Sequence, residues 1–170
     1  MKTFKDYLLE AEGADGTYAA LYPTSESISD LYVYVSDVLR DLAIPIDNKV
    51  SPYDYHCTVM YSRRPIHDFE KHGDMSKDVN IVAKATKFSI LKAEKKTLVL
   101  EIRAPEIDEL FKQFIKLGAT WDFKEYLSHI SIANDVDLEE KNLPPITKPL
   151  NIHFSKLKVV PLDLDHGEEK

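Results

Sequence analysis

The sequence predicts an α+β fold of two pseudo-symmetric halves, each with antiparallel strands and one helix, around a central cleft. The main observation is a string of histidine, apolar, hydroxyl and apolar residues, which occurs at 56–59 and again at 129–132. Each string follows an amphipathic helical pattern after a short connection, which indicates two halves of one plan. A chain of 170 residues is long enough for one compact domain with its own core, expected over 14–161.

The first half is expected to contain a strand, a helix and the first histidine-bearing strand. Residues 17–22 combine aromatic and small apolar residues in a way that is typical of a strand. Thr24 or Ser25 can cap a helix, because apolar residues then recur at helical spacing until Pro45 ends the pattern. The first string lies within a strand expected over 55–61.

The second half is expected to begin with a hairpin, in which strands 79–91 and 96–103 flank a lysine turn. Pro105 suits the first turn of a helix, and Gly118 suits its end. The second string lies within a strand expected over 126–133. The other expected elements are a surface loop over 67–78, a short helix over 135–141, a proline-rich loop over 144–149 and a last strand over 150–160.

A third string, His153-Phe154-Ser155-Lys156, begins like the other two but has lysine where the second apolar residue is expected. We interpret it as an edge strand that carries a surface histidine. The histidines at 67, 72 and 166 lie in polar or terminal stretches and are also expected at the surface.

The two complete strings predict a pair of catalytic histidines. Side chains alternate faces along a strand, so His56 and Thr58 point one way while Cys57 points into the core. The same alternation pairs His129 with Ser131. If the two strands lie side by side, two imidazoles and two hydroxyls line one cleft, which suits acid-base chemistry on a phosphodiester. A strand histidine can instead be a structural hydrogen-bonding residue, but the duplication favours catalysis.

Composition narrows the classes of partner. A net charge of −7 and a pI near 5.4 argue against binding along a long nucleic acid, which requires many lysines and arginines to neutralise phosphates. A small anionic ligand needs only local positive charge. The single cysteine excludes an intramolecular disulfide and fits a reducing compartment. Neither a membrane nor a metal is expected, because no apolar run approaches spanning length and no residues cluster at metal-ligand spacing.

The paired histidine-x-hydroxyl strings resemble the 2H phosphoesterase superfamily, which includes the 2',5'-RNA ligase-like cyclic phosphodiesterases. The resemblance spans about residues 17–160. Within it, Thr-Tyr-Ala-Ala-Leu at 17–21 and His-Cys-Thr-Val-Met-Tyr-Ser-Arg at 56–63 are most similar to the anti-CBASS nucleases of tailed phages. This resemblance implies a bilobal 2H phosphoesterase fold. It also implies cleavage of cyclic di- and trinucleotide immune signals such as 3',3'-cGAMP.

By this resemblance, His56 and His129 carry over as the acid-base pair, and Thr58 and Ser131 as donors to the nonbridging phosphate oxygens. The ribose 2'-hydroxyl would attack the neighbouring phosphorus, with one histidine as base, the other as acid, and no cofactor. The sequence leaves open which histidine is the base and which is the acid.

Two other classes of function stay open. One is an enzyme of RNA ends, a 2',3'-cyclic phosphodiesterase or ligase, and the other is a protein that sequesters cyclic nucleotides without cleaving them.

Aromatic and basic residues near the strings are candidates for substrate binding. Tyr18, Tyr22, Tyr61 and Trp121 could stack on bases, although aromatic residues in strands are more often part of a core. Of these, Tyr18 and Tyr61 are the candidates that we select. Arg63, just past the first string, either steers an anionic ligand or is simply solvated.

The two ends of the chain are expected to lie outside the domain. Residues 1–13 resemble the capsid-targeting leaders of T-even-type phages, in which a protease cuts after a string such as Leu8-Leu9-Glu10. An amphipathic arm is the alternative. The acidic tail over 162–170 is expected to be disordered, or else to close over a ligand as a lid. A leader of this kind predicts packaging in the virion, followed by action in the host cytoplasm.

Overall fold

A computed structural model describes residues 14–64, 66 and 76–163. The expected leader over 1–13, most of the expected loop over 67–78 and most of the acidic tail lie outside these residues. The histidines at 67, 72 and 166 lie outside them as well. Predictions about these segments therefore stay predictions.

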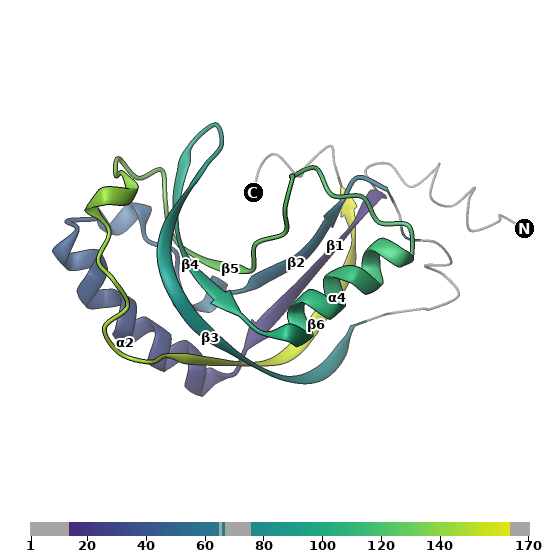
Figure 1. Cartoon of the computed structure of the whole chain (residues 1–170), viewed down its shortest axis with the longest axis horizontal. Coiled ribbons are helices and arrows are strands. Elements are labelled where there is room, and N and C mark those ends of the chain that lie inside the picture. The colour runs from purple at the N-terminus through teal and green to yellow at the C-terminus, as the bar shows by residue number, and fades with distance from the viewer. Residues whose placement is uncertain (1–13, 65, 67–75, 164–170) are drawn as a thin grey trace, which may run out of the picture.

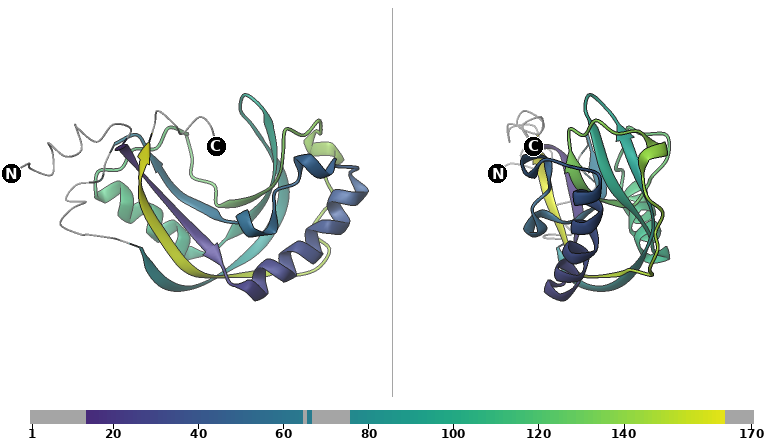
Figure 2. Two further views of the ribbon diagram at one scale, coloured as in Figure 1. Left: turned by 180° about the vertical axis from the view of Figure 1, so that it is seen from behind. Right: turned by 90° about the vertical axis from the view of Figure 1, so that its left-hand side faces the viewer.

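One curved, antiparallel sheet of six strands forms the centre of the fold (Figures 1 and 2). The order across the sheet is β2-β1-β6-β3-β4-β5. The strands are β1 (Ala14–Pro23), β2 (Cys57–Ser62), β3 (Lys77–Lys92), β4 (Lys96–Arg103), β5 (His129–Asn134) and β6 (Asn151–Asp163). The strands that carry the two strings, β2 and β5, are thus the two outermost strands of the sheet.

Two α-helices form where the sequence predicts them. α2 (Ser25–Asp41) begins after Thr24, whose hydroxyl accepts a hydrogen bond of 3.1 Å from the Ser27 amide. α4 (Pro105–Lys116) has proline in its first turn and is followed by Gly118, whose φ of 98° favours glycine. Neither helix is long and apolar enough to cross a bilayer. The connections contain three 3-10 helices, η1 (Ile46–Asn48), η2 (Pro52–Asp54) and η3 (Glu140–Asn142).

The two expected halves are visible as a repeated order of elements within one continuous sheet. β1, α2 and β2 form a strand-helix-strand unit, and β4, α4 and β5 repeat it. In each unit the second strand pairs with the first and ends the sheet on that side. β6 and β3 pair with each other in the middle and so join the halves into one sheet.

Both helices contribute the apolar faces that the sequence predicts to one core. Their buried residues belong to the same cluster as the inward-facing residues of the strands. The helical members are Leu31, Val35, Leu39, Ile107, Leu110 and Phe114. Cys57 is fully buried in this core, as expected. Because side chains alternate along a strand, Thr58 and Ser131 point to the opposite face, where both are only half-buried.

The third string is not on an edge strand, so that interpretation was wrong. β6 lies inside the sheet, between β1 and β3. Lys156 and Lys158 are exposed because one face of this central strand is open to solvent, which a sequence pattern cannot distinguish from an open edge. His153 is exposed, as predicted, and its Nε2 forms a hydrogen bond with the side-chain oxygen of Asn80.

The short helix expected over 135–141 is reduced to η3. Hydrogen bonds to the start of β4 hold the preceding residues in an extended path. The Val136 amide donates to the Lys96 carbonyl over 3.1 Å, and the Lys96 ammonium donates to the Leu138 carbonyl over 3.3 Å. These contacts between distant segments override the local preference for a helix.

Gly16 allows β1 to approach the end of β2 closely. A Cβ at this position would collide with the Ser62 carbonyl, a backbone group that cannot simply move aside.

Gly16→Ala should therefore destabilise the protein by about 2 kcal/mol, the usual cost of overpacking. For a domain of this size this corresponds to a fall of about 4–8 °C in the Tm measured by thermal unfolding. Val160→Ala, at an exposed position of β6, is the control and should change Tm by less than about 2 °C. An unchanged Tm for Gly16→Ala would contradict the close approach.

Candidate active site

The two outermost strands of the sheet meet, because the sheet curls until β2 and β5 contact each other (Figure 1). The segment that leads to β2 also pairs with β5. The Val50 amide donates to the Ile132 carbonyl over 3.0 Å, and Lys49 forms a bridge to Ala133. The chain thus crosses to the second half before it returns to β2. This brings His56, which precedes β2, near His129, which opens β5, so that the charge of His56 contributes to lowering the pKa of His129.

Tyr126 links the two strands from within the core. Its hydroxyl donates to the Thr58 carbonyl over 2.9 Å and lies 3.8 Å from the Cys57 sulfur. Burial raises the pKa of Tyr126, so the phenol keeps the proton that this hydrogen bond requires. The Tyr126 ring stacks on Phe111 of α4, with 4.4 Å between the ring centroids. The helix therefore fixes the tyrosine, and the tyrosine fixes β2 against the start of β5.

Each imidazole is anchored by the same hydrogen bond. His56 Nδ1 lies 2.6 Å from the Asp54 carbonyl oxygen, and His129 Nδ1 lies 2.8 Å from the Leu127 carbonyl oxygen. A carbonyl can only accept, so Nδ1 carries the proton in both rings. Neither ring forms a hydrogen bond through Nε2 with the residues that the structure describes, and an imidazole nitrogen in that position can exchange a proton. In both cases the carbonyl belongs to the residue two positions before the histidine. The two halves therefore repeat this hydrogen bond as well as the sequence string.

The two histidines have different neighbours. Tyr22 of β1 stacks on the His56 ring, with 5.9 Å between the centroids and 29° between the planes. Glu101 of β4 lies opposite His129 in the strand register and is paired with Lys87 over 3.8 Å. Burial lowers the pKa of His129, and the charge of His56 adds to this effect. The hydrogen bond to Leu127 and the Glu101 carboxylate oppose it.

A cavity of about 640 Å³ brings together three of the four predicted catalytic residues, Thr58, His129 and Ser131. His56 is not among its lining residues; it lies beside the cavity, at the start of β2. The Tyr18 hydroxyl lies 3.2 Å from the Thr58 hydroxyl. When the phenol donates in this pair, the Thr58 proton is free to point into the cavity.

The predicted binding residues lie around the same cavity. Tyr61 and Arg63 line it, whereas Tyr18 lies behind Thr58 and packs edge-on against Tyr61, with 6.4 Å between the ring centroids. Arg63 forms an ion pair with Asp122, through its Nε. Its positive charge is therefore partly compensated before any ligand arrives.

Sequence reasoning missed several residues of the site. Tyr22 and Trp121 were weighed as stacking residues but not selected, yet Tyr22 contacts His56 and Trp121 lines the cavity together with the exposed Phe123. Strand alternation places Tyr22 on the same face as Tyr18, which was a usable signal. No local sequence pattern could have identified Glu101, because its position opposite His129 depends on the register of β4 and β5.

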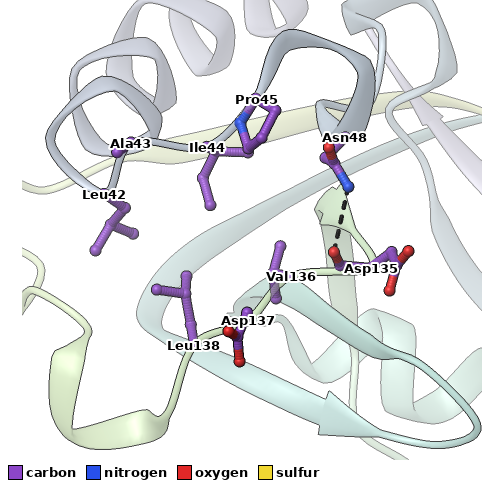
Figure 3. Close-up of a pocket in the computed structure, with 9 residues that line it drawn as sticks. All are labelled: Leu42, Ala43, Ile44, Pro45, Asn48, Asp135, Val136, Asp137 and Leu138. Atoms are coloured by element: carbon purple, nitrogen blue, oxygen red, sulfur yellow. Dashed lines mark hydrogen bonds between the residues drawn. The ribbon is translucent and has the colours of Figure 1, made fainter.

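A second, smaller cavity lies at the far end of β5 (Figure 3). It measures about 200 Å³ and is lined by residues 42–45, Asn48 and 135–138. The Asn48 side chain donates to the Asn134 and Asp135 carbonyls over 3.1 and 3.2 Å. These hydrogen bonds tie η1 to the end of β5, so this region supports the strand that carries His129.

Comparisons with solved structures agree with this fold. The solved structures that resemble the chain include Escherichia coli LigT complexed with NADP+, at a TM-score of 0.60 and 12% sequence identity, with 85% of this chain and 86% of that chain covered. The protein TT0787 of Thermus thermophilus is similar at a TM-score of 0.57 and 13% identity, with the same coverage. At such low identity these structures show a shared α+β fold and no more.

Sequence comparisons identify the family. The chain is 28% identical over 130 residues to anti-CBASS protein Acb1 of Escherichia phage RB16, covering 73% of this chain and 70% of that protein. It is 26% identical over 151 residues to anti-CBASS protein Acb1 of Vibrio phage KVP40, covering 83% of this chain and 91% of that protein. The family model described as anti-CBASS protein Acb1 matches residues 15–169. The chain therefore belongs to the Acb1 family of anti-CBASS proteins.

Proposed function

We propose that this protein is a phosphodiesterase that cleaves the 3',5' bonds of cyclic di- and trinucleotide immune signals, such as 3',3'-cGAMP, without a metal ion. The observation that carries the proposal is the pair of imidazoles, each anchored through Nδ1 and each with Nε2 left for a ligand, where the two outermost strands meet. Membership of an anti-CBASS family supports the choice of substrate. Acting in the host cytoplasm, such an enzyme removes the signal that activates the defence.

The reaction begins with the ribose 2'-hydroxyl beside the scissile bond. His129 Nε2 takes the hydroxyl proton, and the 2'-oxygen forms a bond to phosphorus. The lowered pKa of His129 favours its neutral form near pH 7, which suits it to the role of base. The bond from phosphorus to the 5'-oxygen breaks, and His56 Nε2 donates a proton to that oxygen. The product carries a 2',3'-cyclic phosphate, and the proton gained by His129 balances the one lost by His56.

The hydroxyls stabilise the charge that grows during this step. Thr58 and Ser131 line the cavity on the strand positions two residues after each histidine. From there they donate to the nonbridging phosphate oxygens, which become more negative in the transition state. Tyr18 supports Thr58 when it donates to the Thr58 hydroxyl oxygen, because the Thr58 proton is then free for the phosphate. Tyr61 and Arg63 border the cavity in which the ligand's bases and sugars lie.

An enzyme of RNA ends is the second candidate, because the superfamily that the two strings resemble includes 2',5'-RNA ligase-like cyclic phosphodiesterases. The net charge of −7 disfavours it, since a long strand would run across an acidic surface. A protein that only sequesters nucleotides would not need two imidazoles with matching anchors. Cleavage of a cyclic dinucleotide, compared with opening of a 2',3'-cyclic phosphate at an RNA end, separates the three classes.

His56→Ala and His129→Ala should each reduce cleavage of 3',3'-cGAMP more than about a hundredfold, because each removes a proton-transfer group. His153→Ala is the matched control, because His153 lies in the similar third string but is exposed on β6. It should retain wild-type turnover. The measurement is product formation in EDTA, with circular dichroism to confirm that each variant is folded.

Near-wild-type turnover of either folded variant would overturn the two-histidine mechanism. Activity lost in EDTA and restored by a divalent ion would show that a metal site is involved. Faster opening of RNA ends than of the cyclic dinucleotide would favour the second candidate.

Glu101 should affect the titration of His129, since a carboxylate stabilises the imidazolium form. Glu101→Gln removes that charge and leaves Lys87 without its partner, and both changes lower the pKa of His129. The acidic limb of the pH-rate profile, where the base becomes protonated, should therefore move to lower pH, as should the NMR titration of the His129 ring. Glu94→Gln, in the turn between β3 and β4, is the control and should change neither. A midpoint that stays in place or moves to higher pH would contradict this electrostatic role.

A further inference from the structure

The open face of the sheet carries several cations, and some of them are paired with carboxylates. Three such ion pairs are Arg63 with Asp122, Lys87 with Glu101 over 3.8 Å, and Lys156 with Asp78 over 3.6 Å. Lys158 of β6 is exposed and has no ion pair with any residue among 14–64, 66 and 76–163. Its charge is therefore available to a ligand.

An aromatic ring, rather than a carboxylate, holds Lys158 in place. Its Nζ lies 4.8 Å from the centroid of the Tyr22 ring. The Tyr22 ring in turn stacks on His56. The ammonium group, the phenol ring and the imidazole therefore form a continuous row on one face of the sheet. A cation held on a ring has no carboxylate beside it, whereas a carboxylate partner offsets part of a cation's attraction for an anion.

Strand order separates Lys158 from the reacting phosphate. β6 is two strands away from β2, with β1 between them, so the two backbones lie about 10 Å apart at the usual spacing of about 4.8 Å. Lys158 also lies on the His56 side of the site, beyond Tyr22 and away from His129. A phosphate between the two histidines would thus lie away from Lys158. A cyclic dinucleotide, however, carries a second phosphate across its ring.

We propose that Lys158 binds the phosphate of the cyclic oligonucleotide that is not being cleaved, with Tyr22 as the ring that positions its ammonium group. This inference rests on the proposed phosphodiesterase function and adds a second phosphate subsite to it. The subsite favours small cyclic ligands, because the second negative charge must lie close to the first. It also adds a cation to the two that line the cavity, Lys92 and Arg63, of which Arg63 is partly compensated by Asp122.

Lys158→Gln tests the subsite, and Lys156→Gln is the matched control on the same face of the same strand. Removing one charged hydrogen bond to phosphate should raise the KM for 3',3'-cGAMP about tenfold, with kcat within about a factor of two. Lys156→Gln should leave both constants unchanged, and Lys158→Arg should restore most of the affinity. The increase of KM with salt should be smaller for Lys158→Gln than for the wild type.

A linear 3',5'-dinucleotide with a single phosphate distinguishes the two phosphate positions. Used as substrate or as competitive inhibitor, it should bind the wild type and Lys158→Gln equally well. Equal losses for the cyclic and linear ligands would overturn the proposal, because Lys158 would then contact the scissile phosphate. A fall in kcat with unchanged KM would also overturn it, because Lys158 would then act through Tyr22 on His56.

Failure of the subsite and failure of the proposed function give different results. If the wild type cleaves 3',3'-cGAMP and Lys158→Gln behaves like Lys156→Gln, only the subsite is wrong. If the wild type neither cleaves nor binds the cyclic dinucleotide, the proposed function is wrong and the subsite is overturned with it.

Discussion

The contact between β2 and β5 is the constraint on which the rest of the site depends. These strands end the sheet on opposite sides, and only the curl of the sheet brings them together. Three interactions hold that contact: the pairing of Lys49 and Val50 with β5, the Tyr126 hydrogen bond to Thr58, and the Asn48 hydrogen bonds to the end of β5. Each joins residues far apart in the sequence, so the site forms only when the whole domain has folded.

Two histidines at equivalent positions of the two halves can have opposite chemical roles when different side chains lie beside them. Both histidines use the same Nδ1 anchor, two residues back in the chain. They differ in what lies beside them, an aromatic ring at His56 and a carboxylate at His129, and burial lowers the pKa of His129. Acid-base catalysis needs one proton acceptor and one donor at the same pH, and asymmetric surroundings are the simplest way to obtain both from one residue type.

Local patterns in the sequence predicted the helices, the hairpin, the burial of Cys57 and the strands β2 and β5, because periodicity and capping act over a few residues. His56, expected within the first of these strands, lies just before it. Features that depend on register were harder to predict. The sequence could not show that Glu101 faces His129, that Asp122 pairs with Arg63, or that β6 lies inside the sheet. Lys156 suggested an edge strand, but it is exposed because one face of a central strand is open.

In the proposed mechanism, a ribose 2'-hydroxyl attacks phosphorus between the two histidines. The most direct measurement compares 3',3'-cGAMP with an analogue that has deoxyribose at both positions, following products by mass spectrometry and ³¹P NMR. We expect the parent compound to yield a 2',3'-cyclic phosphate, and the analogue to bind with similar affinity without being cleaved. Cleavage of the analogue at a comparable rate would rule out this attack, because water would then have to be the nucleophile.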